Sequence, residues 1–232
     1  KLLAEKLGGT RFAFPAYETT TGKAILEHLK QEWRCDFNTD YPAWPLDKHR
    51  SLNALVFQCL QTVNRFELLD EIKAAQAKGP VIFDRYTASG LVYGGLDGLD
   101  VQWIEKINAS LPQPDVWIYL DIPIEESFKR RPERRDRYES DRSYLERVRE
   151  GYLKLFEEKR HLGHSCPCGG EGFANHICSR CGSYGRWYVV DGLGTIDEIH
   201  TRIVKIFTKV CETAGHWFGA KGLCVSCGER KS

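Results

Sequence analysis

The sequence predicts an α/β fold built around a doubly wound parallel sheet with flanking helices. Short apolar runs that end in an acidic residue alternate with amphipathic stretches, as strands and helices do in such folds. The runs are Pro80 to Asp84, Val116 to Asp121 and Tyr188 to Asp191, and Arg11 to Phe14 adds a shorter strand. Runs that are apolar almost throughout indicate strands buried on both faces. We therefore expect the functional site at the carboxyl ends of these strands.

Helical periodicity predicts the layers that cover the sheet. Lys1 to Leu7 is an amphipathic segment that Gly8-Gly9 ends. Apolar residues recur at helical spacing in four further stretches, which are Leu26 to Trp33, Leu52 to Lys78, Tyr144 to Lys159 and Ile196 to Cys211. We expect each stretch to form one helix.

The composition limits the classes of protein that fit. A chain of 232 residues, 42% of them hydrophobic, can bury one large core, or one core and a small appendage. The 33 basic and 32 acidic residues nearly cancel, so no overall field favours nucleic acid or an anionic membrane. We find no apolar run near the roughly 20 residues that cross a bilayer, and no secretory leader, so we expect a cytoplasmic protein. The sequence contains no methionine, which leads us to expect a fragment or an edited chain.

The first cluster with chemical meaning follows the strand that ends at Asp84. Asp84 and Arg85 are adjacent there, and Ser89-Gly90 and Tyr93 come within the next eight residues. A carboxylate binds a hard cation such as Mg²⁺, and a guanidinium binds two phosphate oxygens at once. The cluster therefore indicates a phosphate site, with a surface ion pair as the alternative.

The second cluster is a dense group of cations beyond the strand that ends at Asp121. Phosphoryl transfer needs such a group, because the migrating phosphoryl carries negative charge on three oxygens. A solvated helix face is the alternative. The cluster consists of Lys129, Arg130, Arg131, Arg134, Arg135 and Arg137.

Six short segments, in this order, closely resemble the thymidylate kinases. The resemblance covers residues 1 to about 160 and resumes from about 187 to 211. The segments are Phe14-Pro15, Thr21-Gly22-Lys23, Asn64-Arg65-Phe66-Glu67, Asp84-Arg85-Tyr86 with Ser89-Gly90, Leu111-Pro112 with Pro114-Asp115, and Asp136-Arg137-Tyr138-Glu139.

This resemblance implies the fold of P-loop nucleoside monophosphate kinases and the transfer of the γ-phosphate of ATP to dTMP, with Mg²⁺, to give dTDP. It also implies a homodimer, for which Phe57 and Phe66 on the long helix supply a face. The kinase core would comprise residues 1–160 and 187–211, with a lid at about 129–139. A kinase for another nucleoside monophosphate is an alternative.

Roles for individual residues follow from the same resemblance. Asp84 would serve Mg²⁺, Arg85 the acceptor phosphate, and Arg130 the charge in transfer. Arg65 would hydrogen-bond the thymine edge. The remaining residues would contact or enclose the nucleotide: Phe14 and Tyr93 as walls, Ser89 and Gly90 beside the base, Tyr138 as a cover, and Arg131, Arg134, Arg135 and Arg137 in the lid. Core packing is the alternative for Phe14, Tyr93 and Tyr138.

The sequence departs from the family pattern at three places. Tyr17 stands where many members have an arginine for the acceptor phosphate, although Arg11 is near in the sequence, and Gln61 replaces an aromatic residue that stacks on thymine. No G-x-x-x-x-G-K-[ST] loop occurs. The resemblance therefore implies that a first strand and a phosphate loop are absent, and that the fragment alone is inactive.

Cysteine spacing predicts one zinc site and favours a second, both structural rather than catalytic. Two tight pairs in segment 161–186 supply four thiolates, with His164 or His176 as a substitute ligand and a redox dithiol as the alternative. The tail, 212–232, supplies most of the second set. The ligands are Cys166, Cys168, Cys178 and Cys181 for the first site, and Cys211, His216, Cys224 and Cys227 for the second.

A second class of function competes with the kinase. Zinc knuckles often contact single-stranded nucleic acid, so the chain could be a zinc-dependent binding module on a catalytically dead kinase scaffold. The segment 161–186 carries few basic residues, which argues against nucleic acid as a partner.

Overall fold

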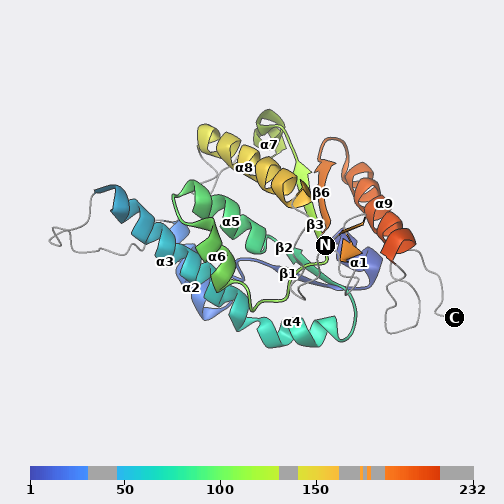
Figure 1. Cartoon of the computed structure of the whole chain (residues 1–232), viewed down its shortest axis with the longest axis horizontal. Coiled ribbons are helices and arrows are strands. Elements are labelled where there is room, and N and C mark those ends of the chain that lie inside the picture. The colour runs from blue at the N-terminus through green and yellow to red at the C-terminus, as the bar shows by residue number, and fades with distance from the viewer. Residues whose placement is uncertain (31–45, 131–140, 162–172, 175–176, 179–185, 215–232) are drawn as a thin grey trace.

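The computed structural model describes residues 1–30, 46–130, 141–161, 173–174, 177–178 and 186–214. Within these ranges the predicted alternation of parallel strands and helices is present, which confirms an α/β fold. Figure 1 shows the strands in the middle of the molecule, with helices around them. No helix in these ranges combines the length and the hydrophobicity needed to cross a bilayer.

Four strands form two parallel pairs. Strand β1 (Thr10–Ala13) pairs with β2 (Val81–Asp84), and β3 (Val116–Asp121) pairs with β6 (Arg186–Asp191). The expected single sheet is thus present only in part, because no ladder joins β2 to β3 in the described part of the chain. Strands bond only at a spacing of about 4.8 Å, so β2 and β3 are not direct neighbours. A short antiparallel pair, β4 (Phe173–Ala174) and β5 (Ile177–Cys178), stands apart from both.

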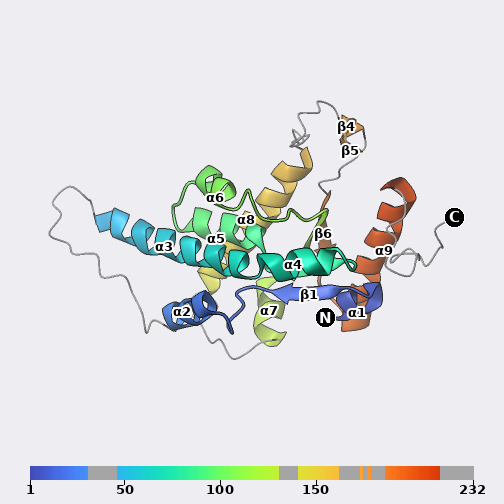
Figure 2. The same cartoon turned by 90° about the horizontal axis from the view of Figure 1, so that it is seen from below.

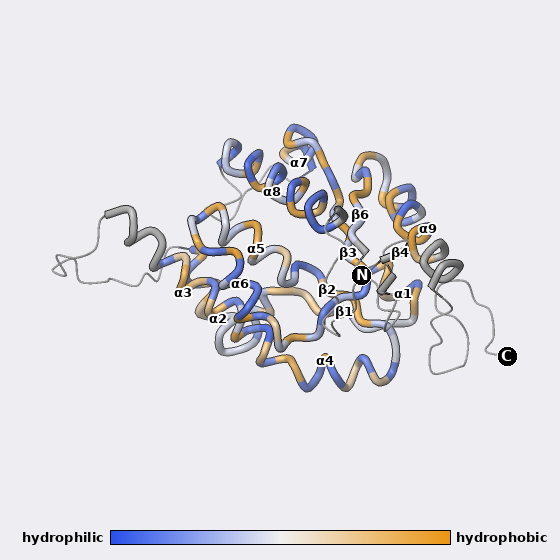
Figure 3. Tube along the Cα trace, in the orientation of Figure 1, coloured by the Kyte–Doolittle hydropathy of each residue, from blue (hydrophilic) through white to orange (hydrophobic). Residues whose placement is uncertain are grey.

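Helices α1, α8 and α9 cover their predicted stretches, whereas the helix predicted from Leu26 to Trp33 is α2, which begins at Thr20 and ends at Leu29. Helix α1 ends at Gly8, whose φ of 62° is the left-handed conformation that glycine adopts at low cost. Hydrophobic and hydrophilic residues alternate along α8 and α9, as they do on amphipathic helices (Figure 3). The described helices are α1 (Leu2–Leu7), α2 (Thr20–Leu29), α3 (Leu46–Glu67), α4 (Leu69–Gln76), α5 (Thr87–Leu96), α6 (Val101–Ile107), α7 (Ile124–Arg130), α8 (Arg142–His161) and α9 (Ile196–Ala214).

One long helix was predicted from Leu52 to Lys78, and this prediction is wrong. The segment is divided into α3 and α4, which run nearly end to end (Figure 2). The backbone at Leu68, with φ −100° and ψ 8°, leaves the helical range and separates them. The break lets Phe66 and Leu68 both pack against the cluster of buried residues around Phe14.

A large aromatic core joins α8 to the β3 and β6 pair. Trp117 of β3 stacks on Trp187 of β6 with ring centroids 4.6 Å apart, and Phe156 of α8 meets Trp187 edge-on at 4.7 Å. Tyr119 stacks on Tyr152 at 4.8 Å. These contacts fix α8 against the sheet by apolar burial and by ring geometry.

Two ion pairs add to this attachment. The guanidinium of Arg149, on α8, binds both carboxylate oxygens of Asp121 at the end of β3, at 2.6 and 2.8 Å. This hydrogen-bonded pairing raises the pKa of Arg149. Arg142 at the start of α8 pairs with Glu125 of α7. The carboxyl end of β3 is therefore tied to α8, and α8 is tied to α7.

We predict that Gly22→Ala destabilises the protein by about 2 kcal/mol or more, because overpacking of this kind forces the backbone to move. A Cβ at Gly22 would lie 1.8 Å from the carbonyl oxygen of Ala16. Gly79→Ala is the matched control, since a Cβ there meets nothing closer than 3.8 Å. Urea unfolding of the variants measures the difference. Equal stability of the two variants would contradict the close approach of α2 to the 14–17 segment.

Candidate active site

The pairing of β1 with β2 brings together an acidic and a basic residue that lie far apart in the sequence. Asp84 is in register with Ala13, so Arg11, two residues before Ala13, lies on the same face of the pair. The guanidinium of Arg11 contacts Oδ2 of Asp84 at 2.5 Å. The two side chains are 40% and 51% exposed, so the pair contributes little to stability. The ion pair lies at the strand end, where the sequence predicted the site.

Arg85 turns the chain from β2 into α5. Its φ of 56° is a left-handed conformation, which costs a non-glycine residue about 1 kcal/mol. Its guanidinium donates a hydrogen bond to the hydroxyl of Tyr93 at 3.2 Å and lies 5.8 Å from the centre of that ring. Two predicted site residues, Arg85 and Tyr93, are therefore in direct contact.

Ser89 lies on the first turn of α5, beside α8. Its hydroxyl and the hydroxyl of Tyr152 are 2.7 Å apart and share a hydrogen bond. Burial raises the pKa of Tyr152 to about 12, so this phenol stays protonated at neutral pH. The sequence did not single out Tyr152, because its spacing on α8 is that of an ordinary core residue.

Arg65 is a buried cation at the end of α3. Only 2% of it is exposed, and burial lowers its pKa to about 10. Its guanidinium donates to Oδ1 of Asn108 at 3.1 Å and to the carbonyl oxygen of Tyr86 at 3.2 Å. Nη2 also lies 3.8 Å from the position that a Cβ at Gly90 would take. Arg65 therefore reaches the first turn of α5, which carries the predicted site residues Ser89 and Gly90.

Phe14 is a core residue in this structure. It is 5% exposed and packs on Tyr86 with ring centroids 5.4 Å apart. Tyr86 in turn stacks on Phe83 at 4.1 Å. These contacts fit core packing, the alternative that the sequence left open for Phe14.

Arg130 lies at the other strand pair. Its guanidinium donates to the carbonyl oxygens of Gly192 and Gly194 at 2.9 and 3.3 Å, and to Glu126 at 2.9 Å. It is thus attached to the turn after β6, and its contacts do not include Asp84 or Arg85. The other predicted lid residues, Arg131, Arg134, Arg135, Arg137 and Tyr138, lie outside the described residues.

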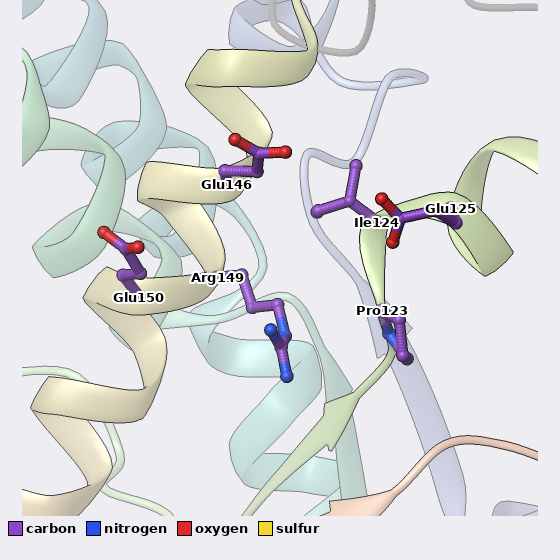
Figure 4. Close-up of a pocket in the computed structure, with 6 residues that line it drawn as sticks. All are labelled: Pro123, Ile124, Glu125, Glu146, Arg149 and Glu150. Atoms are coloured by element: carbon purple, nitrogen blue, oxygen red, sulfur yellow. The ribbon is translucent and has the colours of Figure 1, made fainter.

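A cavity of about 270 Å³ lies between α7 and α8. Figure 4 shows Arg149 extending into the space between the two helices, with Glu146 and Glu150 on the same helix and Glu125 opposite. None of the predicted nucleotide contacts lines this cavity, whose lining is Pro123, Ile124, Glu125, Glu146, Arg149 and Glu150.

The predicted zinc ligands fall almost entirely outside the described part of the chain. Cys178 and Cys211 lie in β5 and α9, and the structure describes their backbone alone. Among the residues that are described, no group of three or more His, Cys, Asp or Glu side chains is arranged to hold a metal ion. The remaining predicted ligands are Cys166, Cys168, Cys181, His216, Cys224 and Cys227.

Asn64 fixes the segment that follows β1. It is fully buried, and its Oδ1 accepts a hydrogen bond from the backbone amide of Ala16 at 2.8 Å. Its Nδ2 donates to Oγ1 of Thr19 at 2.7 Å. Thr19 caps α2 through the amide of Gly22 at 3.1 Å. One side chain on α3 therefore holds both the 14–17 segment and the start of α2.

Solved structures with a similar fold are thymidylate kinases. The enzyme from Candida albicans is 22% identical, with 91% of this chain and 83% of that chain aligned and a TM-score of 0.55. The enzyme from Ehrlichia chaffeensis is 18% identical, over 89% of this chain and 88% of that chain, with a TM-score of 0.53. At these identities the likeness establishes the fold alone.

The family model described as thymidylate kinase matches residues 1–163, so the chain belongs to the thymidylate kinase family. The thymidylate kinase of Schizosaccharomyces pombe is 25% identical over 90% of this chain and 82% of its own length. The probable thymidylate kinase 1 of Saccharolobus solfataricus is 41% identical over 39% of this chain. The chain spans about half the length of this relative and of the probable thymidylate kinase of Methanococcus aeolicus, 46% and 50% respectively.

We predict that Asn64→Ala destabilises the protein by about 2 to 3 kcal/mol, because the buried amide of Ala16 loses its acceptor along with the other bonds. Gln76→Ala, at an exposed position on α4, is the control and should change stability by less than about 0.5 kcal/mol. Thermal or urea unfolding measures both. A loss at Asn64 no larger than that of the control would show that this network does not hold the segment.

Proposed function

We propose that the protein transfers the γ-phosphate of ATP to dTMP, forming dTDP, in nucleotide biosynthesis. Membership of the family supports this proposal. The observation that carries it is the turn at Arg85, which directly follows Asp84 and sets its guanidinium against Tyr93, while Arg65 reaches the same helix. One cation at each end of this region suits a ligand with a phosphate and a polar base.

In the reaction, the acceptor phosphate oxygen forms a bond to the γ-phosphorus and the bond to the oxygen of ADP breaks. Arg85 holds the acceptor phosphate, and Asp84 serves Mg²⁺ or its waters. Mg²⁺ takes most of its ligands from water and phosphate oxygens, so one half-exposed carboxylate at a strand end fits it. When bound, the ion neutralises charge on the phosphates. Ser89, Gly90 and Tyr93 face the nucleoside from α5.

The lid is part of this proposal. Arg130 stabilises the charge in transfer once it leaves the carbonyl oxygens of Gly192 and Gly194. Arg131, Arg134, Arg135, Arg137 and Tyr138 complete the lid. The phosphates of ATP need a phosphate-binding loop. These 232 residues contain no G-x-x-x-x-G-K-[ST] motif, so we predict that they are inactive by themselves.

We also propose a homodimer in the cytoplasm, but through a different part of α3 than the sequence suggested. Phe57 and Phe66 were expected to supply the face. Phe57 is 5% exposed in the core, so it cannot reach a partner, and Phe66 packs against the cluster of buried residues around Phe14. Leu55 and Val63 on α3 are 36% and 47% exposed and supply an apolar surface instead. Binding of nucleic acid is not proposed, since family membership favours the kinase.

Structural zinc in the segment 161–186 is a further part of the proposal. Cysteine spacing supports it, and so does the β4–β5 hairpin, which brings the chain back on itself just before Cys178 ends β5. Structural zinc sites take four Cys or His ligands in a closed tetrahedron, and two cysteine pairs supply such a set.

We predict that Arg85→Ala lowers kcat/KM for dTMP by about 100-fold or more, because a charge-assisted contact to the acceptor phosphate is lost. The protein is expressed from the complete reading frame that holds these 232 residues, and coupled assays compare dTMP with dUMP, dCMP and dGMP. Arg142→Ala, at an exposed ion pair on α8, is the control.

Unchanged kinetics in Arg85→Ala would remove this residue from the site. A higher kcat/KM for dCMP or dGMP than for dTMP in the unaltered protein would instead overturn the proposed acceptor.

We predict that the purified protein contains about one or two zinc ions per chain, because four thiolates form a closed tetrahedral site. Inductively coupled plasma mass spectrometry measures the metal before and after a chelator. Cys178→Ser with Cys181→Ser should remove one ion, and Cys59→Ser on α3 should remove none. If protein purified from cells grown in zinc-supplemented medium contains no zinc, the zinc proposal is wrong.

A further inference from the structure

The ring of Tyr152, on α8, contacts both the sheet and α5. It stacks on Tyr119 of β3, with ring centroids 4.8 Å apart and an angle of 11° between the rings. It also meets Tyr93 of α5 edge-on, at 6.5 Å and 76°. Aromatic pairs prefer these two geometries, and both add to the stabilisation from apolar burial. The ring of Tyr152 therefore helps to fix where Tyr93 lies relative to the sheet.

The hydroxyl of Tyr152 makes a second link to α5. Among the described residues its hydrogen-bond partner is the hydroxyl of Ser89, at 2.7 Å. Burial raises the pKa of Tyr152 to about 12, so the phenol keeps its proton at neutral pH. A phenol proton without an acceptor costs free energy, and the oxygen of Ser89 is the acceptor within reach. Tyr152 is therefore the donor, and Ser89 keeps its own proton for another partner.

Both links lead to residues of the candidate site. The hydroxyl of Tyr93 accepts a hydrogen bond from the guanidinium of Arg85 at 3.2 Å, and that guanidinium lies 5.8 Å from the centre of the Tyr93 ring. A shift of Tyr93 would therefore move the group to which Arg85 is attached. Ser89 is half-buried on the first turn of α5, so its proton is accessible to a bound molecule.

We propose that Tyr152 is a positioning residue of the acceptor site, an inference that rests on the proposed function. Its hydroxyl fixes the hydroxyl of Ser89 as a donor to an oxygen of the nucleoside. Its ring holds Tyr93 and, through Tyr93, the guanidinium of Arg85 at the acceptor phosphate. The two parts of one side chain thus serve two parts of the nucleotide, and Tyr152 itself does not touch the ligand.

Tyr152→Phe tests the hydroxyl, because it keeps the ring. In the protein from the complete reading frame, we expect the KM for dTMP to rise about fivefold in a coupled assay while kcat stays the same, as when a binding contact weakens equally in substrate and transition state. In a Ser89→Ala background the same change should alter KM less than about twofold. Tyr119→Phe is the matched control, because it removes a phenol hydroxyl from the same ring stack and should leave KM unchanged.

Tyr152→Leu tests the ring. It removes the edge contact with Tyr93, so Arg85 is held less firmly. Competition binding compares dTMP with thymidine, which has no phosphate for Arg85. We expect Tyr152→Leu to weaken dTMP binding at least about fivefold more than it weakens thymidine binding, since a charge-assisted contact is lost. Thermal unfolding shows whether each variant is folded, and Tyr152→Phe decides the proposal if Tyr152→Leu does not fold.

Two results would overturn the role of the hydroxyl. One is a KM in Tyr152→Phe equal to that of the unaltered protein, and the other is an effect of the same size with and without the hydroxyl of Ser89. An equal loss for dTMP and thymidine in folded Tyr152→Leu would overturn the link to Arg85. If the unaltered protein does not bind dTMP, the proposed function is wrong as well, so the two failures are distinguishable.

Discussion

The buried guanidinium of Arg65 is the constraint on which the arrangement of the site depends. A charge placed in the interior is costly unless hydrogen bonds compensate it. Asn108 supplies one acceptor from the end of α6, and the carbonyl oxygen of Tyr86 supplies another from the turn after β2. The ring of Tyr86 lies 5.9 Å below the same group. Since the acceptors lie on different elements, α3, α6 and the β2–α5 turn have to hold one relative position.

The β2–α5 turn carries most of the candidate site because that turn is fixed in this way. Asp84 and Arg85 emerge at its start, where Arg11 of the neighbouring strand neutralises the carboxylate. Gly90 and Tyr93 follow on the first turns of α5. One continuous stretch of about ten residues can then contact both a phosphate at the strand end and a base beside Gly90. Helices α3 and α8 pack against this stretch. Asn64, next to Arg65, fixes the 14–17 segment on the other side.

The sequence predicted the parts of this arrangement that depend on local pattern. The bounds of β3 were right to the residue, and Asp84 and Arg85 were placed at a strand end. It did not predict the break at Leu68, because the apolar period continues through it. The pairing of Arg11 with Asp84 depends on strand register, and the contact of Tyr152 with Ser89 depends on how two helices pack. Burial of Phe14 and the attachment of Arg130 to Gly192 are tertiary contacts of the same kind, which periodicity does not encode.

The most direct test of the account is a crystal structure of the protein from the complete reading frame with dTMP bound. The account predicts the phosphate within hydrogen-bond distance of the guanidinium of Arg85, and the thymine base beside Ser89 and Tyr93 of α5. A nucleotide bound elsewhere, for example in the cavity between α7 and α8, would contradict it.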